Sequence, residues 1–137
     1  MYMQRGRFGA TASYQNVNVA SRIEGATPHK LVQMMYEELL KALEAMALAA
    51  DRGDFVQRGQ RQSKALAILS ALETSLDFDK GGDIARGLLA IYREARRLVV
   101  AGGRDGQIQS IEDARVMLNE IANAWDAIGQ KGSGSVI

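Results

Sequence analysis

Four stretches of this chain carry apolar side chains at every third or fourth position, and this spacing limits what the chain can fold into. Residues three and four apart lie on one face of an α-helix, so each stretch predicts an amphipathic helix. Only a few residues separate one stretch from the next. Short connections make successive helices antiparallel neighbours, and steps near ~3.5 residues favour packing at about 20°. The sequence therefore predicts an all-α fold, an antiparallel up-down four-helix bundle.

The ends of these helices are expected at residues that cap or break them. Side chains such as Thr and Asp accept hydrogen bonds from the free N–H groups at a helix start. Proline is tolerated in the first turn, where Pro28 stands, and glycine permits the backbone angles of a helix end. The expected caps are Thr27, Asp54, Asp83 and either Ser110 or Asp105, and the expected stops are Gly53, the Gly81-Gly82 turn and Gly102-Gly103.

The spacing also predicts which side chains face the core. One apolar position recurs in each turn of each helix. The predicted core-facing residues are Leu31, Met35, Leu39, Ala42, Met46 and Ala50 in the first helix; Phe55, Gln62, Leu66, Leu69, Leu72 and Leu76 in the second; Ile84, Leu88, Ile91, Ala95 and Leu98 in the third; and Ile111, Ala114, Leu118, Ile121, Trp125 and Ile128 in the fourth.

The chain is expected to form one domain with two loosely structured ends. Residues 1–26 are rich in small and polar side chains and are interpreted as a mobile arm, with a short helix near Val17–Ile23 in some contexts. Residues 27–128 form the predicted bundle. Residues 129–137 are expected to be a disordered tail.

Charge and composition exclude several classes of function. The chain has 17 basic and 16 acidic residues, a net charge of +1, and these charges alternate, which argues against a nucleic-acid binder. It has no cysteine, so disulfides and thiolate metal sites are absent. No apolar run approaches the roughly 20 residues needed for membrane insertion. The sequence is therefore interpreted as that of a cytoplasmic protein.

Catalytic chemistry finds little support in the sequence. His29 is the only histidine, and it stands in the first turn of a predicted helix, where a solvated side chain is expected. Asp77, Asp79 and Asp83 surround the glycine turn, but their spacing is not that of a calcium loop, and capping explains them more simply. We expect no catalytic residue, no metal and no cofactor, and conclude that the chain is not an enzyme.

The predicted helices carry more apolar positions than one bundle core requires, and two of them contain glycine. Leu40, Ile68, Leu89 and Val99 fall beside the narrow apolar faces, and those of them that are exposed together would form a patch that needs a partner. Gly59 and Gly87 lie inside helices, where glycine costs about 1 kcal/mol relative to alanine. Close helix packing is the favoured explanation of these glycines, and a shallow partner groove is the alternative.

A set of short motifs lies along the chain from Tyr14 to Trp125. The motifs are Tyr14-Gln15, Pro28 to Tyr36, Lys64-Ala65 with Ile68, Leu69 and Leu72, Ser75 to Asp77, Gly81 to Ala85, Leu88 to Tyr92, and Ala124-Trp125. In this order and spacing they resemble the flagellin export chaperones of the FliS family. Two positions depart from the resemblance: Glu37-Glu38 replaces the family's frequent Asp-Gly, and Gly87 replaces a frequent asparagine.

This resemblance implies a chaperone that binds the disordered C-terminal segment of flagellin, prevents its premature polymerisation and assists its transfer to the flagellar export apparatus. An amphipathic client would fold as helices into apolar grooves of the bundle. We hypothesise that the arm covers part of the groove, with Tyr14 as plug. A monomer or weak homodimer is expected. The candidate partner-binding residues are Tyr14, Leu40, Ile68, Leu72, Gly87, Leu88, Ile91 and Tyr92.

Two other classes of function remain open at this point. A phosphotransfer signalling bundle would use His29 as the phosphate acceptor. A self-assembling structural helical protein would bury the surplus apolar residues between copies of the chain.

Overall fold

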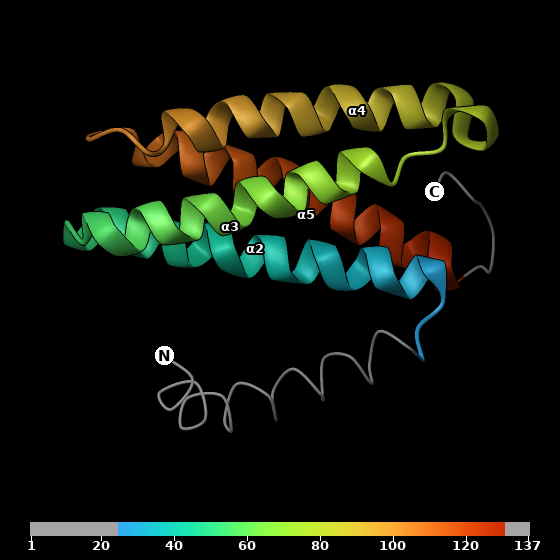
Figure 1. Ribbon diagram of the computed structural model, residues 1–137, viewed down its shortest axis with the longest axis horizontal. Coiled ribbons are helices and arrows are strands. Elements are labelled where there is room, and N and C mark those ends of the chain that lie inside the picture. Colours follow the sequence, from blue (N-terminus) through green and yellow to red (C-terminus); the bar gives the residue numbers. More distant parts are fainter. Residues whose placement is uncertain (1–24, 131–137) are drawn as a thin grey trace, which may run out of the picture.

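The computed structural model describes residues 25–130, which form four helices around one core (Figure 1). α2 packs on α3 and α5, and α4 closes the ring by packing on the same two helices. The predicted all-α four-helix bundle is confirmed. None of the helices in this part of the chain is long and apolar enough to cross a membrane. The helices are α2 (Pro28–Arg52), α3 (Phe55–Thr74), α4 (Phe78–Ala101) and α5 (Ile108–Gln130).

The first connection is built as the sequence predicts. The Thr27 hydroxyl accepts from the backbone N–H of Lys30 at 3.1 Å and caps α2. Gly53 ends α2 with a left-handed φ of 71°, which a side chain would strain. Asp54 then caps α3 by accepting from the N–H of Gln57 at 3.1 Å. These two adjacent residues let the chain reverse direction at once.

The start of α4 differs from the prediction. Asp77, not Asp83, is the cap, because its carboxylate accepts from the N–H of Lys80 at 3.0 Å. One helical turn follows before Gly82, whose φ of 50° and ψ of −125° break the regular helix. Asp83 lies beyond this break and pairs with Arg86 instead. The glycine turn is therefore a kink near the start of a helix rather than the gap between two helices.

The bounds of α5 also differ from the prediction. The helix begins at Ile108, so Ser110 lies inside its first turn, and the Asp105 carboxylate accepts from Arg58 at 3.0 Å rather than capping a helix. At its other end α5 continues to Gln130. Gly129, expected in the tail, lies in this last turn against the His29 ring, where a Cβ would collide with the imidazole.

The core face of α4 shares the fully buried Ala95 with the predicted face but is otherwise offset from it by one residue. Ala85, Tyr92 and Val99 are fully buried, whereas Ile84 is 65% exposed and Ile91 is half-buried. Both sets recur at helical spacing, so periodicity alone does not separate them. The offset follows from Tyr92, whose hydroxyl has a partner inside the bundle. Phe55 of α3, another predicted core residue, is exposed.

Two tyrosines meet at the centre of the bundle. The hydroxyls of Tyr36 on α2 and Tyr92 on α4 form a short hydrogen bond with each other, and both residues are buried. Burial raises the pKa of Tyr36, and the bond to Tyr92 offsets this only in part. Burial, followed by the charge and hydrogen bond of Tyr36, raises the pKa of Tyr92 strongly. The folded bundle therefore holds both phenolic protons more tightly than an unfolded chain does.

This pair predicts a loss of stability in base. Above about pH 10, the unfolded chain releases phenolic protons that the folded chain retains, so unfolding becomes easier as the pH rises. The contribution of the raised tyrosine pKa values to the free energy of unfolding is fully present below about pH 10 and is lost as the pH rises further. We expect the unfolding free energy of the wild type, relative to a Tyr36→Phe/Tyr92→Phe variant, to fall by up to about 2.7 kcal/mol per pH unit. Urea titrations from pH 8 to 11 measure this difference, and parallel curves for the two proteins would contradict it.

His29 is not the solvated residue that its first-turn position predicts. Its ring stacks on Trp125 of α5, with centroids 4.6 Å apart and planes 8° from parallel. The Trp125 indole N–H donates to the backbone carbonyl of His29 at 3.0 Å. The His29 Nε2 atom is buried and has no hydrogen-bond partner in the described part of the chain. This contact fastens the start of α2 to the end of α5.

Candidate functional site: the groove between α2 and α3

An apolar groove runs between α2 and α3 on the surface of the bundle. Its volume is about 520 Å³, and its walls are almost entirely hydrocarbon. We call it the α2–α3 groove. Large exposed apolar hollows of this kind mark binding sites more often than bare surface. It is lined by Leu31, Met34, Met35 and Glu38 of α2 and by Lys64, Ala67, Ile68 and Ala71 of α3.

The groove follows from the same helical register on both sides. Each helix contributes residues at positions i, i+3, i+4 and i+7, which form one edge of a helix over about two turns, or roughly 10 Å. The α2 wall carries the long flexible side chains of Met34 and Met35, and the α3 wall carries the small side chains of Ala67 and Ala71. The alanines leave the space, and the unbranched methionines adapt to whatever fills it.

A charged pair marks one end of the groove. The Lys64 ammonium lies 3.4 Å from the Glu38 carboxylate, which also accepts from Lys41 at 3.3 Å. Partial burial raises the pKa of Glu38, but the hydrogen bond from Lys41 and the charges of Lys64 and Lys41 outweigh it, so the pKa lies below its usual value. Both partners are about half exposed, so the pair contributes little to stability. It sets a polar boundary to an apolar surface.

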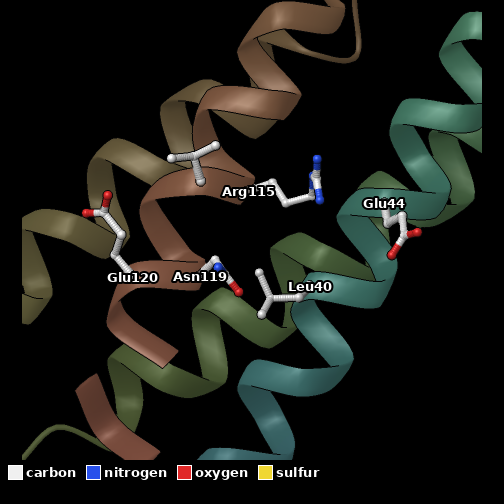
Figure 2. A pocket seen from close by; sticks show the side chains of 6 residues that line it. Leu40, Glu44, Arg115, Asn119 and Glu120 are labelled. Atoms are coloured by element: carbon white, nitrogen blue, oxygen red, sulfur yellow. The ribbon is translucent and has the colours of Figure 1, made fainter. Parts of the chain in front are cut away.

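Val99, one of the four surplus residues, is fully buried, and Leu40 does not join Ile68 in this groove, so these two form no shared patch. Leu40 lines a separate hollow between α2 and α5 (Figure 2). Figure 2 shows Leu40 and Asn119 facing each other across this hollow, with Arg115 extending toward Glu44. A hydrogen bond and the charge of Glu112, with a smaller effect of Glu44, raise the pKa of Arg115. This hollow is mostly polar and suits an apolar client less well than the α2–α3 groove.

The candidate residues on α4 form a third surface. Gly87 is exposed, and Leu88 and Ile91 are half-buried. They share one flank of the helix with the exposed Ile84. A Cβ added at Gly87 would meet nothing within 4 Å, and the same holds for Gly59. The favoured explanation of these two glycines as close helix contacts is therefore wrong, and the space beside Gly87 is open.

Two candidate residues lie in the core. Leu72 and Tyr92 have no exposed surface, because Leu72 faces the centre of the bundle and Tyr92 is bonded to Tyr36. Neither can touch a partner unless the bundle opens, so we remove both from the proposed binding surface. Tyr14 lies outside the described residues.

Five apolar residues of the α2–α3 groove are absent from the candidates that the sequence predicts. Leu31 and Met35 belong to the predicted core face of the first helix, but they are only half-buried. Met34, Ala67 and Ala71 fit no narrow apolar face. The sequence pattern that could predict this groove is a pair of small residues one helical turn apart, Ala67 and Ala71, next to the surplus apolar residue Ile68. Which neighbouring helix these residues meet depends on the tertiary structure.

Known proteins similar to this chain belong to one group. A family model described as flagellar protein FliS matches residues 10–132, which include all four described helices. The flagellar secretion chaperone FliS of Salmonella typhimurium is 34% identical over 122 residues, covering 88% of this chain and 90% of that protein. The flagellar secretion chaperone FliS of Vibrio cholerae is 32% identical over 120 residues, covering 88% of each. The flagellar secretion chaperone FliS of Escherichia coli is 26% identical over 126 residues, covering 91% of this chain and 90% of that protein.

Proposed function

The chain belongs to the FliS family, and from this membership we propose that it is a flagellar secretion chaperone whose client is the C-terminal segment of flagellin. The client would lie as an amphipathic helix in the α2–α3 groove. Bound in this way, flagellin would be kept from polymerising early and held ready for the flagellar export apparatus. The relatives are named as chaperones, a class without catalytic chemistry, so no catalytic residue is assigned.

The single observation that carries this proposal is the hydrocarbon lining of the α2–α3 groove. A groove about two helical turns long accepts the apolar side chains of one face of a client helix. The methionines on its α2 wall adjust to side chains of different shape. The charged pair of Glu38 and Lys64 offers a polar contact where the client would leave the groove.

The size of the groove indicates a longer interface. A disordered segment that folds on binding typically buries about 1,000–3,000 Å² and loses several kcal/mol to ordering. A 10 Å groove alone does not bury that much. We therefore propose that the client continues over the α4 flank formed by Ile84, Gly87, Leu88 and Ile91, where Gly87 leaves its backbone accessible. We further propose that the chaperone acts in the cytoplasm as a monomer or weak homodimer.

Calorimetry with a synthetic C-terminal flagellin peptide from the same organism tests the proposal. We expect saturable binding with a negative heat-capacity change, the mark of buried apolar surface. A peptide of scrambled sequence is the control, since it has the same composition without the amphipathic face. No saturable heat from a chaperone that circular dichroism shows to be folded would refute the proposal.

The structure argues against the phosphotransfer alternative. The Nε2 atom of His29 is buried against Gly129, and one face of the ring is covered by Trp125. A phosphoryl donor needs open access to the acceptor nitrogen. Phosphotransfer through His29 Nε2 would require the end of α5 to detach.

A further inference from the structure

Four arginines gather along the second half of α4 and just beyond it. Arg93, Arg96, Arg97 and Arg104 line one hollow of about 370 Å³, together with Val100 and Ala101. We call this the α4 arginine surface. The whole chain has a net charge of only +1, so the surface is a local concentration of positive charge rather than a general property.

Two of these arginines already hold carboxylates. Arg96 donates to Glu73 at 3.2 Å, and Arg97 donates to Glu94 at 2.9 Å. Arg93 and Arg104 are exposed and form no ion pair within residues 25–130. Arg93 lies in α4, whereas Arg104 lies in the turn that follows the helix. Between them stands Val100, whose side chain is 46% exposed.

The α4 arginine surface is separate from the α2–α3 groove. Ile68 faces α2 from one flank of α3, whereas Ser70 and Glu73 contact Arg96 of α4 from the other flank. α3 thus stands between the two sites. The α4 arginine surface shares no lining residue with the groove or with the α4 flank of the proposed client site.

We propose that the α4 arginine surface binds an acidic peptide segment of a second protein. The carboxylates of that segment would pair with Arg93 and Arg104, since guanidinium groups bind carboxylates through paired N–H donors. An apolar side chain between the carboxylates would cover Val100. A nucleic acid fits less well, because no aromatic side chain of residues 25–130 lines the hollow for a base to stack on, and its centre is apolar. The proposal does not depend on the identity of the client in the groove.

A fluorescent peptide of alternating glutamates around one central leucine tests this proposal by anisotropy with the full chain. We expect saturable binding at 20 mM salt that weakens steeply by 300 mM, because exposed charges are screened beyond about 10 Å at 0.1 M salt. The Arg93→Glu/Arg104→Glu variant should bind about tenfold or more weakly, since two attractive pairs become repulsive. A Lys41→Glu/Lys80→Glu variant makes the same change of net charge at exposed sites elsewhere and should bind like the wild type.

Two further comparisons in the same anisotropy experiment distinguish the possible partners. Replacing the central leucine of the peptide by serine should weaken binding to the wild type, and Val100→Ser should remove that difference. A single-stranded oligonucleotide of equal charge should bind more weakly than the peptide. Equal weakening by both double variants, no binding of the peptide at low salt, or tighter binding of the oligonucleotide would each overturn the proposal.

Discussion

Ile68→Glu should weaken binding of the flagellin peptide by about 100-fold, because it removes an apolar contact and places a carboxylate in the apolar α2–α3 groove, where the client would bury it. Ile68 is half-buried in the wall of the groove, so the free chaperone tolerates the charge at its surface. Calorimetry measures the change in affinity. Circular dichroism establishes that the variant is still helical.

Val56→Glu is the matched control for this experiment. Val56 lies on the same helix, is 72% exposed and does not line the groove. The Val56→Glu variant should bind the peptide with the affinity of the wild type. A second variant, Ala67→Leu, fills the groove without adding charge and should also weaken binding. Wild-type affinity in both Ile68→Glu and Ala67→Leu would show that the client binds elsewhere.

Tyr92→Ala is expected to have the largest effect on stability, lowering the unfolding free energy by about 3–5 kcal/mol. The change opens a cavity where a fully buried ring packs and leaves the Tyr36 hydroxyl buried without its partner. Marginal stability is typical of single domains, so a loss of this size removes much of the total. Urea unfolding followed by circular dichroism measures it.

Phenylalanine variants separate the hydroxyl from the ring. Tyr92→Phe keeps the ring but orphans the Tyr36 hydroxyl, which should cost about 1–3 kcal/mol. Removing both hydroxyls in Tyr36→Phe/Tyr92→Phe leaves no orphan, so the double variant should be more stable than the sum of the single variants predicts. Strict additivity of the two single changes would show that the hydroxyls do not act as a pair.

The sequence predicts the helices well because their ends are set by local chemistry. Thr27, Gly53 and Asp54 act through bonds to residues within one turn, and the structure confirms all three. Gly82 shows the limit of this reasoning. A glycine turn is equally consistent with a break between helices and with a kink inside one, and here the outcome follows from Asp77, which caps the helix one turn earlier.

The candidate site was harder to predict because it depends on which helices are neighbours. The helical pattern marks Ile68 as surplus to the core, but it places Leu31 and Met35, which line the groove with Ile68, on the core face of the first helix. Both assignments fit a helical period, and only the position of α3 beside α2 decides between them. Tyr92 was misplaced for the related reason that its hydroxyl partner, Tyr36, lies 56 residues away in the sequence.

The stacking of His29 on Trp125 gives the molecule a built-in optical reporter. Trp125 is the only tryptophan in the chain, and its indole rests on the first turn of α2, two residues before Leu31 opens the α2–α3 groove. Tryptophan fluorescence therefore monitors the end of the bundle where α2 begins and α5 ends. A binding experiment with the proposed client peptide can follow this emission on the unlabelled protein.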